Sequence, residues 1–111
     1  MSVTIRNIIP RKSAESVLTA QYTAANCKTL IDKFTATNTS AAIATLSVYL
    51  VASGGAANTF NQVLVTKSIQ PGECYLCPEI VGQSLEPGGF IATFASASSA
   101  ITISCTAREI T

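Results

Sequence analysis

Two cysteines spaced like half of a metal or redox site stand in the segment CYLC, residues 74–77. A structural zinc site normally needs a second such pair, but Cys27 and Cys105 each stand alone. A redox pair normally begins a helix, whereas Pro78 follows this one and the preceding residues have the pattern of a strand. In an extended strand, residues 74 and 77 face opposite sides. The thiols are therefore interpreted as small buried side chains, and no metal is expected.

Acid–base chemistry has few candidates because the chain contains no histidine. A cysteine nucleophile needs a base beside it, and histidine is the usual base. Glu73, Glu79 and Glu86 fall in one segment, but a calcium loop needs its oxygen ligands at closer, alternating spacing. We interpret these carboxylates as solvated turn charges. The protein is expected not to be an enzyme and to use no cofactor.

Basic residues gather near the N-terminus, although the net charge of the chain is only +1. Arg6, Arg11 and Lys12 all precede the first acidic residue, Glu15. One interpretation is a solvated N-terminal arm over residues 1–12, since chain ends are often poorly ordered. The other is an arm that contacts an acidic neighbour. Nucleic-acid binding is not expected, because the aromatic residues are not interleaved with a basic stripe.

The composition predicts one domain whose surface is partly covered by other subunits. The 111 residues suit a single domain. They are 48% hydrophobic and 12% charged, against roughly 25% charged in an average soluble domain. The longest apolar runs are far shorter than the ~20 residues of a membrane-spanning helix, and the N-terminus lacks the apolar core of a signal peptide. Burial in an assembly would explain so uncharged a surface.

A two-residue alternation of apolar and polar side chains dominates the chain and predicts β-strands. In residues 101–110, for example, Ile101, Ile103, Cys105 and Ala107 alternate with polar residues. Turn residues separate such segments, most clearly in QPGE and EPGG. The sequence therefore predicts an all-β, single antiparallel β-sandwich domain over residues 1–111, either jelly-roll or Ig-like. Its eight expected strands are 3–9, 17–23, 29–37, 43–51, 62–69, 73–77, 89–96 and 101–110.

Several of these turns and strands also follow a recurring pattern: TNTS at a strand end, VYLV before a Gly/Ser loop, a PGE turn, GQSLEPGG, and a Thr/Ser-rich last strand. With this pattern, residues 20–111 resemble small structural proteins encoded in tailed-phage genomes. The cysteines are not part of the pattern. The resemblance implies a virion protein, made in the host cytoplasm, of the capsid cement or decoration type. Such proteins bind the outer face of the major capsid protein shell, often as homotrimers. For this role, Arg6, Arg11 and Lys12 are the expected capsid contact.

Other functions remain open at this point. A neck, tail or fibre-associated adaptor would also be structural but present in few copies. A receptor- or carbohydrate-binding module would need exposed aromatic residues, for which Phe60 and Tyr22 are the candidates. A small zinc protein would use the four cysteines.

Overall fold

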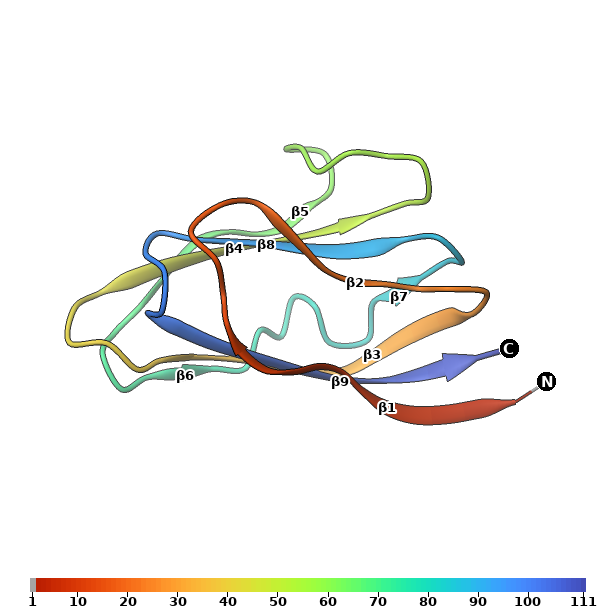
Figure 1. Ribbon diagram of the computed structural model, residues 1–111, viewed down its shortest axis with the longest axis horizontal. Coiled ribbons are helices and arrows are strands. Elements are labelled where there is room, and N and C mark those ends of the chain that lie inside the picture. The colour runs from red at the N-terminus through yellow and green to blue at the C-terminus, as the bar shows by residue number, and fades with distance from the viewer. Residues whose placement is uncertain (1) are drawn as a thin grey trace.

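The computed structural model describes residues 2–111, and every regular element in that range is a β-strand (Figure 1). The expected all-β antiparallel sandwich is confirmed. Residues 2–111 include no helix of the length and apolarity that crossing a membrane requires. The strands are β1 (Val3–Ser13), β2 (Thr19–Thr23), β3 (Lys28–Asn38), β4 (Ala44–Val51), β5 (Gln62–Ile69), β6 (Cys74–Tyr75), β7 (Ser84–Leu85), β8 (Phe90–Ala95) and β9 (Ile101–Ile110).

The strands form two sheets that face each other. Sheet A has the order β1-β9-β3-β6, with β7 also paired to β3, and sheet B has the order β2-β8-β4-β5. Antiparallel pairs are nested along the chain: β1 with β9, β2 with β8, β3 with β6 and β7, and β4 with β5. This nesting is the topology of a jelly roll, in which β6 and β7 together take the place of one strand.

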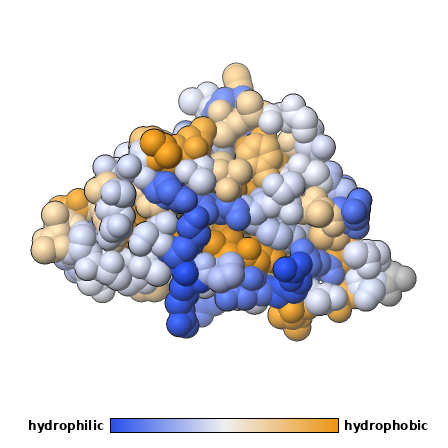
Figure 2. Space-filling model, viewed as in Figure 1, coloured by the Kyte–Doolittle hydropathy of each residue, from blue (hydrophilic) through white to orange (hydrophobic). Residues whose placement is uncertain are grey.

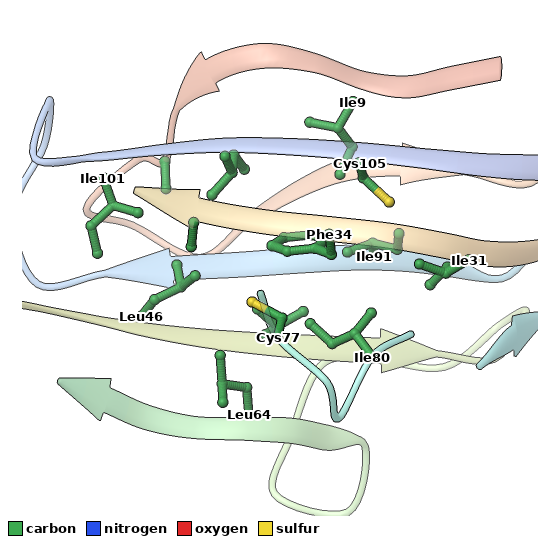
Figure 3. Close-up of a cluster of buried hydrophobic side chains, with 14 of the residues drawn as sticks. Ile9, Ile31, Phe34, Leu46, Leu64, Cys77, Ile80, Ile91, Ile101 and Cys105 are labelled. Carbon is green, nitrogen blue, oxygen red and sulfur yellow. The ribbon is translucent and has the colours of Figure 1, made fainter. Parts of the chain in front are cut away.

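The core lies between the sheets and is built by the alternation seen in the sequence. In β9, Ile101, Ile103, Cys105 and Ala107 are buried while the residues between them are half-exposed. Phe34 of β3 lies at the centre, with Ile31, Leu46, Ile91 and Ile101 around it (Figure 3). Each large apolar side chain buried in this way contributes about 1.5–3 kcal/mol to folding.

The two Pro-Gly turns carry the chain between the sheets. QPGE follows β5 of sheet B and leads to β6 of sheet A, and EPGG returns the chain from β7 to β8. Gly72 and Gly88 have φ of 79° and 88°, a left-handed conformation that favours glycine. A Cβ on Gly88 would also lie 2.4 Å from Ser53 Oγ. These turns therefore need glycine for their backbone conformation and, at Gly88, for space.

The strand expected at 73–77 is wrong in extent, because only Cys74 and Tyr75 pair with β3. The chain then leaves the sheet in turns and rejoins the same edge of β3 at the short strand β7, which was not predicted. Pro78 has no N–H to donate to a sheet, and Gly82 has φ of 88°, so a continuous strand cannot form here. The turns still bury Cys77 and Ile80 in the core (Figure 3).

Asn38 fixes the turn TNTS at the end of β3. Its side chain is fully buried, and its amide nitrogen donates to the carbonyls of Ala42 and Ile69, both at 2.8 Å. Its oxygen accepts from the backbone N–H and the hydroxyl of Ser40, at 2.9 and 2.7 Å. Because Ile69 ends β5 of sheet B, this one side chain joins the two sheets. A fully satisfied buried amide of this kind specifies the turn rather than destabilising it.

Candidate interaction surfaces

The cysteines occupy two kinds of environment. Cys77 and Cys105 are core residues, and burial raises the pKa of each thiol to about 12. They are therefore protonated at neutral pH and poor nucleophiles. Cys74 is exposed, which corrects the expectation that both cysteines of CYLC are buried. All four cysteines are free thiols, and residues 2–111 contain no cluster of three or more side chains suited to hold a metal ion.

Alkylation of the native protein is expected to modify one cysteine, Cys74, because the other three thiols are buried. Intact-mass measurement after iodoacetamide treatment should show a single adduct, and Cys74→Ser should remove it. Unfolding in urea before treatment should give four adducts, one for each cysteine. Rapid modification of the native Cys74→Ser variant would contradict the burial of the remaining thiols.

The three glutamates of the Pro-Gly segment serve separate local contacts. Glu73 accepts a hydrogen bond from the Gln70 backbone N–H at 2.8 Å, inside the QPGE turn. Glu79 accepts from the Tyr75 hydroxyl at 2.8 and 2.6 Å. Glu86 lies 3.8 Å from the ammonium of Lys28. All three are exposed, as turn charges are expected to be, and the structure does not bring them together.

Residues 3–13, which include most of the proposed arm, form the edge strand β1 along β9. The three cations differ in their partners. Arg6 donates to Glu109 at 2.9 Å, and Lys12 donates to Glu15 at 2.9 Å. Arg11 makes no ion pair within residues 2–111 and is exposed. Of the proposed capsid contact, Arg11 is thus the residue whose charge is free for another partner.

A polar network joins the two sheets at one end of the sandwich. We call it the Glu109 network: Glu109 of β9, Arg6 of β1, Tyr22 of β2 and Thr29 of β3. The Tyr22 hydroxyl donates to Glu109 and, having one proton, accepts from the Thr29 hydroxyl at 2.9 Å. Burial raises the pKa of Tyr22, and the hydrogen bond to Glu109 adds to this effect. Tyr22 therefore has a structural role, which removes it as an exposed aromatic for carbohydrate binding.

Glu109→Gln is expected to lower the free energy of unfolding by about 1–2 kcal/mol at neutral pH. The Tyr22 hydrogen bond, followed by the Arg6 contacts, holds the pKa of Glu109 below its ordinary value of 4.5. Because the folded pKa is depressed, this stabilisation is present above 4.5 and is lost as the pH falls through the folded pKa. Urea unfolding at several pH values should show the gap between wild type and variant closing in acid. A gap that is constant with pH would contradict this assignment.

The two outer faces of the sandwich differ sharply in charge. Sheet B has a single charged strand residue, Lys67 of the edge strand β5. Its ammonium lies 4.8 Å from the centre of the Tyr75 ring, which belongs to β6 of sheet A. Figure 2 shows the most hydrophilic residues mainly in the half of the molecule where β1 lies, while the half over sheet B is mostly pale or hydrophobic. The charged strand residues of sheet A are Arg6, Arg11, Lys12, Lys28, Asp32, Lys33, Arg108 and Glu109.

Aromatic side chains take the place of charges on the outer face of sheet B. Leu46 and Val48 of β4 point into the core, so Ser47 and Tyr49 point outward. Their direct partners on β8 are Phe94, which is 42% exposed, and Ala92. We call these four residues the aromatic face; Phe94 is exposed on it, Tyr49 is half-buried, and Ser47 and Ala92 are buried beneath their neighbours. An uncharged surface that carries aromatic residues is typical of a protein–protein interface core.

A loop beside this face, held by internal hydrogen bonds, presents a further aromatic residue. The loop 52–61 connects β4 to β5 and projects beyond sheet B (Figure 1). Asn58 and Asn61 hold its tip, because the Asn58 side chain accepts from the Phe60 N–H and the Asn61 side chain accepts from the Asn58 N–H, both at 2.9 Å. Phe60, at this tip, is 97% exposed. A hydrogen-bonded loop that exposes a whole phenylalanine ring suits binding to a partner.

The fold is similar to that of chains in two virus particle structures. One is the crystal structure of the T13 IBDV viral particle, with a TM-score of 0.52 and 12% identity over 97% of this chain and 31% of that chain. The other is the structure of the infectious bursal disease virus Gx strain, with a TM-score of 0.51 and 14% identity over 98% of this chain and 33% of that chain. This chain therefore spans about a third of the length of each neighbour. At these identities the similarity shows a shared fold.

The amino-acid sequence itself matches no protein-family model and no curated protein. The structural similarity and the two outer faces are thus the observations from which a function is inferred.

Proposed function

We propose that this protein is a non-enzymatic virion structural protein that binds the outer surface of a phage capsid and stabilises it. The observation that carries the proposal is a jelly roll with one uncharged outer face, on which Phe94 is exposed and Tyr49 half-buried, beside the Phe60 loop. The fold similarity to chains of the IBDV particle supports a virion role. The resemblance of residues 20–111 to tailed-phage structural proteins supports the cement or decoration type.

The physical basis of the role is selective binding. A protein that binds the assembled shell and not its separated subunits stabilises the shell by mass action. The aromatic face and Phe60 supply apolar area for such binding, and no charged strand residue has to be desolvated on that face. The partner is the major capsid protein, and the protein binds as a homotrimer at symmetry axes of the shell. Size-exclusion chromatography with light scattering tests the trimer.

Quantitative mass spectrometry of gradient-purified virions tests the location. A copy number comparable with that of the major capsid protein is expected from a decoration protein. A copy number that fits one ring at a single vertex would instead support the neck or tail adaptor and overturn the decoration role. Absence from purified virions would overturn the virion role altogether.

A further inference from the structure

A polar hollow of about 260 Å³ lies on the outer face of sheet A, on the side of the sandwich opposite the aromatic face. Three adjacent strands line it: β1 supplies Arg11, β3 supplies Lys33 and Thr35, and β9 supplies Ser104 and Thr106. Lys33 is directly opposite Thr106, and Thr35 is directly opposite Ser104. The hollow is therefore built on the paired centre of the sheet and not on a loop.

Two irregularities in the strands bring both cations to this face. In β3, the register shifts between Ile31 and Lys33, so that Asp32 and Lys33 both project outward while Ile31 and Phe34 stay buried. In β1, the register shifts by one residue between Ile9 and Lys12, so that Pro10 and Arg11 together lie opposite Ser104. Pro10 has no N–H and so is compatible with such a bulge.

The two cations of the polar hollow have no carboxylate partner within residues 2–111. The acid next to Lys33 in the chain, Asp32, is already held by Arg108, whose Nε and Nη2 donate to it at distances of 2.7–3.1 Å. The acid nearest to Arg11 in the chain, Glu15, is already paired with Lys12. The remaining lining groups are the three hydroxyls, each of which can both donate and accept a hydrogen bond. The hollow thus offers two positive charges and three hydroxyls to a ligand.

We propose that the polar hollow binds an acidic sugar residue of a glycan. Its volume is below the roughly 300–1,000 Å³ of sites for drug-sized ligands, so the hollow itself holds about one sugar unit of the glycan. Arg11 and Lys33 pair with the charged acid group of the sugar. The hydroxyls of Thr35, Ser104 and Thr106 exchange hydrogen bonds with the sugar hydroxyls, which likewise donate and accept. A single acidic protein side chain carries only acceptor atoms, whereas an acidic sugar also carries hydroxyls that can both donate to and accept from the three hydroxyls of the hollow. This activity goes beyond the proposed capsid binding and does not depend on it.

Titration of the full-length ¹⁵N-labelled protein with glucuronate, followed by two-dimensional NMR, tests the proposal. Glucuronate is expected to shift the amide signals of Lys33, Thr35, Ser104 and Thr106 in a saturable way. Glucose, the neutral counterpart, should bind at least roughly tenfold more weakly, since it lacks the charge-assisted hydrogen bonds. Lys33→Ala and Arg11→Ala should each weaken glucuronate binding roughly tenfold for the same reason. Lys28→Ala, which removes a cation of β3 outside the hollow, should bind glucuronate like wild type.

Three outcomes would overturn the proposal: no saturable shift with glucuronate, equal binding of glucose and glucuronate, or unchanged binding in both the Arg11 and Lys33 variants. A triglutamate peptide that binds this site as tightly as glucuronate would also overturn it, in favour of an acidic protein segment. The folded state of each variant is read from the same spectra, so a loss of binding cannot be confused with a loss of fold.

Discussion

Replacement of Phe34 by alanine is expected to lower the free energy of unfolding by about 3–5 kcal/mol, the typical cost of removing a buried aromatic side chain. Phe34 is 0% exposed and lies at the centre of the core, between the sheets. The residue paired with it on the neighbouring strand β9 is Cys105, also a core residue. Since domains of this size are stable by only about 5–15 kcal/mol, the variant should be near the limit of folding. Urea unfolding followed by circular dichroism measures the change.

Phe60→Ala is the matched control, because it removes the same side chain from a position that is 97% exposed. A change within about 0.5 kcal/mol is expected for such a surface site. Equal losses of unfolding free energy in the two variants would contradict the burial of Phe34 in the core. So would a loss below about 1 kcal/mol for Phe34→Ala, since cavities in a close-packed core cost more than that.

The strands of this protein could be predicted because the core imposes a two-residue alternation on the sequence. β9 is the clearest case, since its buried and half-exposed residues alternate from Ile101 to Ala107. The paired strands β6 and β7 could not be predicted in the same way. Each is two residues long, too short for a period to be visible, and the turns between them bury Cys77 and Ile80 without strand geometry. β1 also runs further than the strand expected at 3–9, because the chain continues along β9 through a bulge at Pro10 and Arg11 to Ser13.

The interaction surfaces were harder to predict than the strands, because they depend on which strands are neighbours. The contrast between the sheets follows from the jelly-roll order, which places the charge-rich segments β1, β3 and β9 together. The polar hollow needs the same order and also the bulge at Lys33. One signal was present in the sequence: the consecutive polar pair Asp32-Lys33 interrupts the alternation of β3. By itself, such an interruption does not say which strand lies opposite.

The largest effect on the proposed capsid binding is expected from Phe94→Asp, which should weaken binding to purified shells at least about thirtyfold, the loss of about 2 kcal/mol that defines an interface hot spot. Phe94 lies in the middle of the aromatic face, opposite Ser47. A carboxylate there would have to be desolvated against an apolar partner surface, with no cation on the neighbouring strands to pair with it. Co-sedimentation of the labelled protein with shells that lack it measures the affinity.

Ile5→Asp provides the control, because it places the same charge at an exposed apolar residue of sheet A. Ile5 is 72% exposed on the edge strand β1, away from the aromatic face, so the variant should bind shells like wild type. Thermal unfolding of both variants separates a binding defect from a folding defect. If Phe94→Asp binds normally while Ile5→Asp does not, the docking face is sheet A. In that case the free cation Arg11 becomes the stronger candidate for the capsid contact, because sheet A carries the charges that an acidic shell surface would attract.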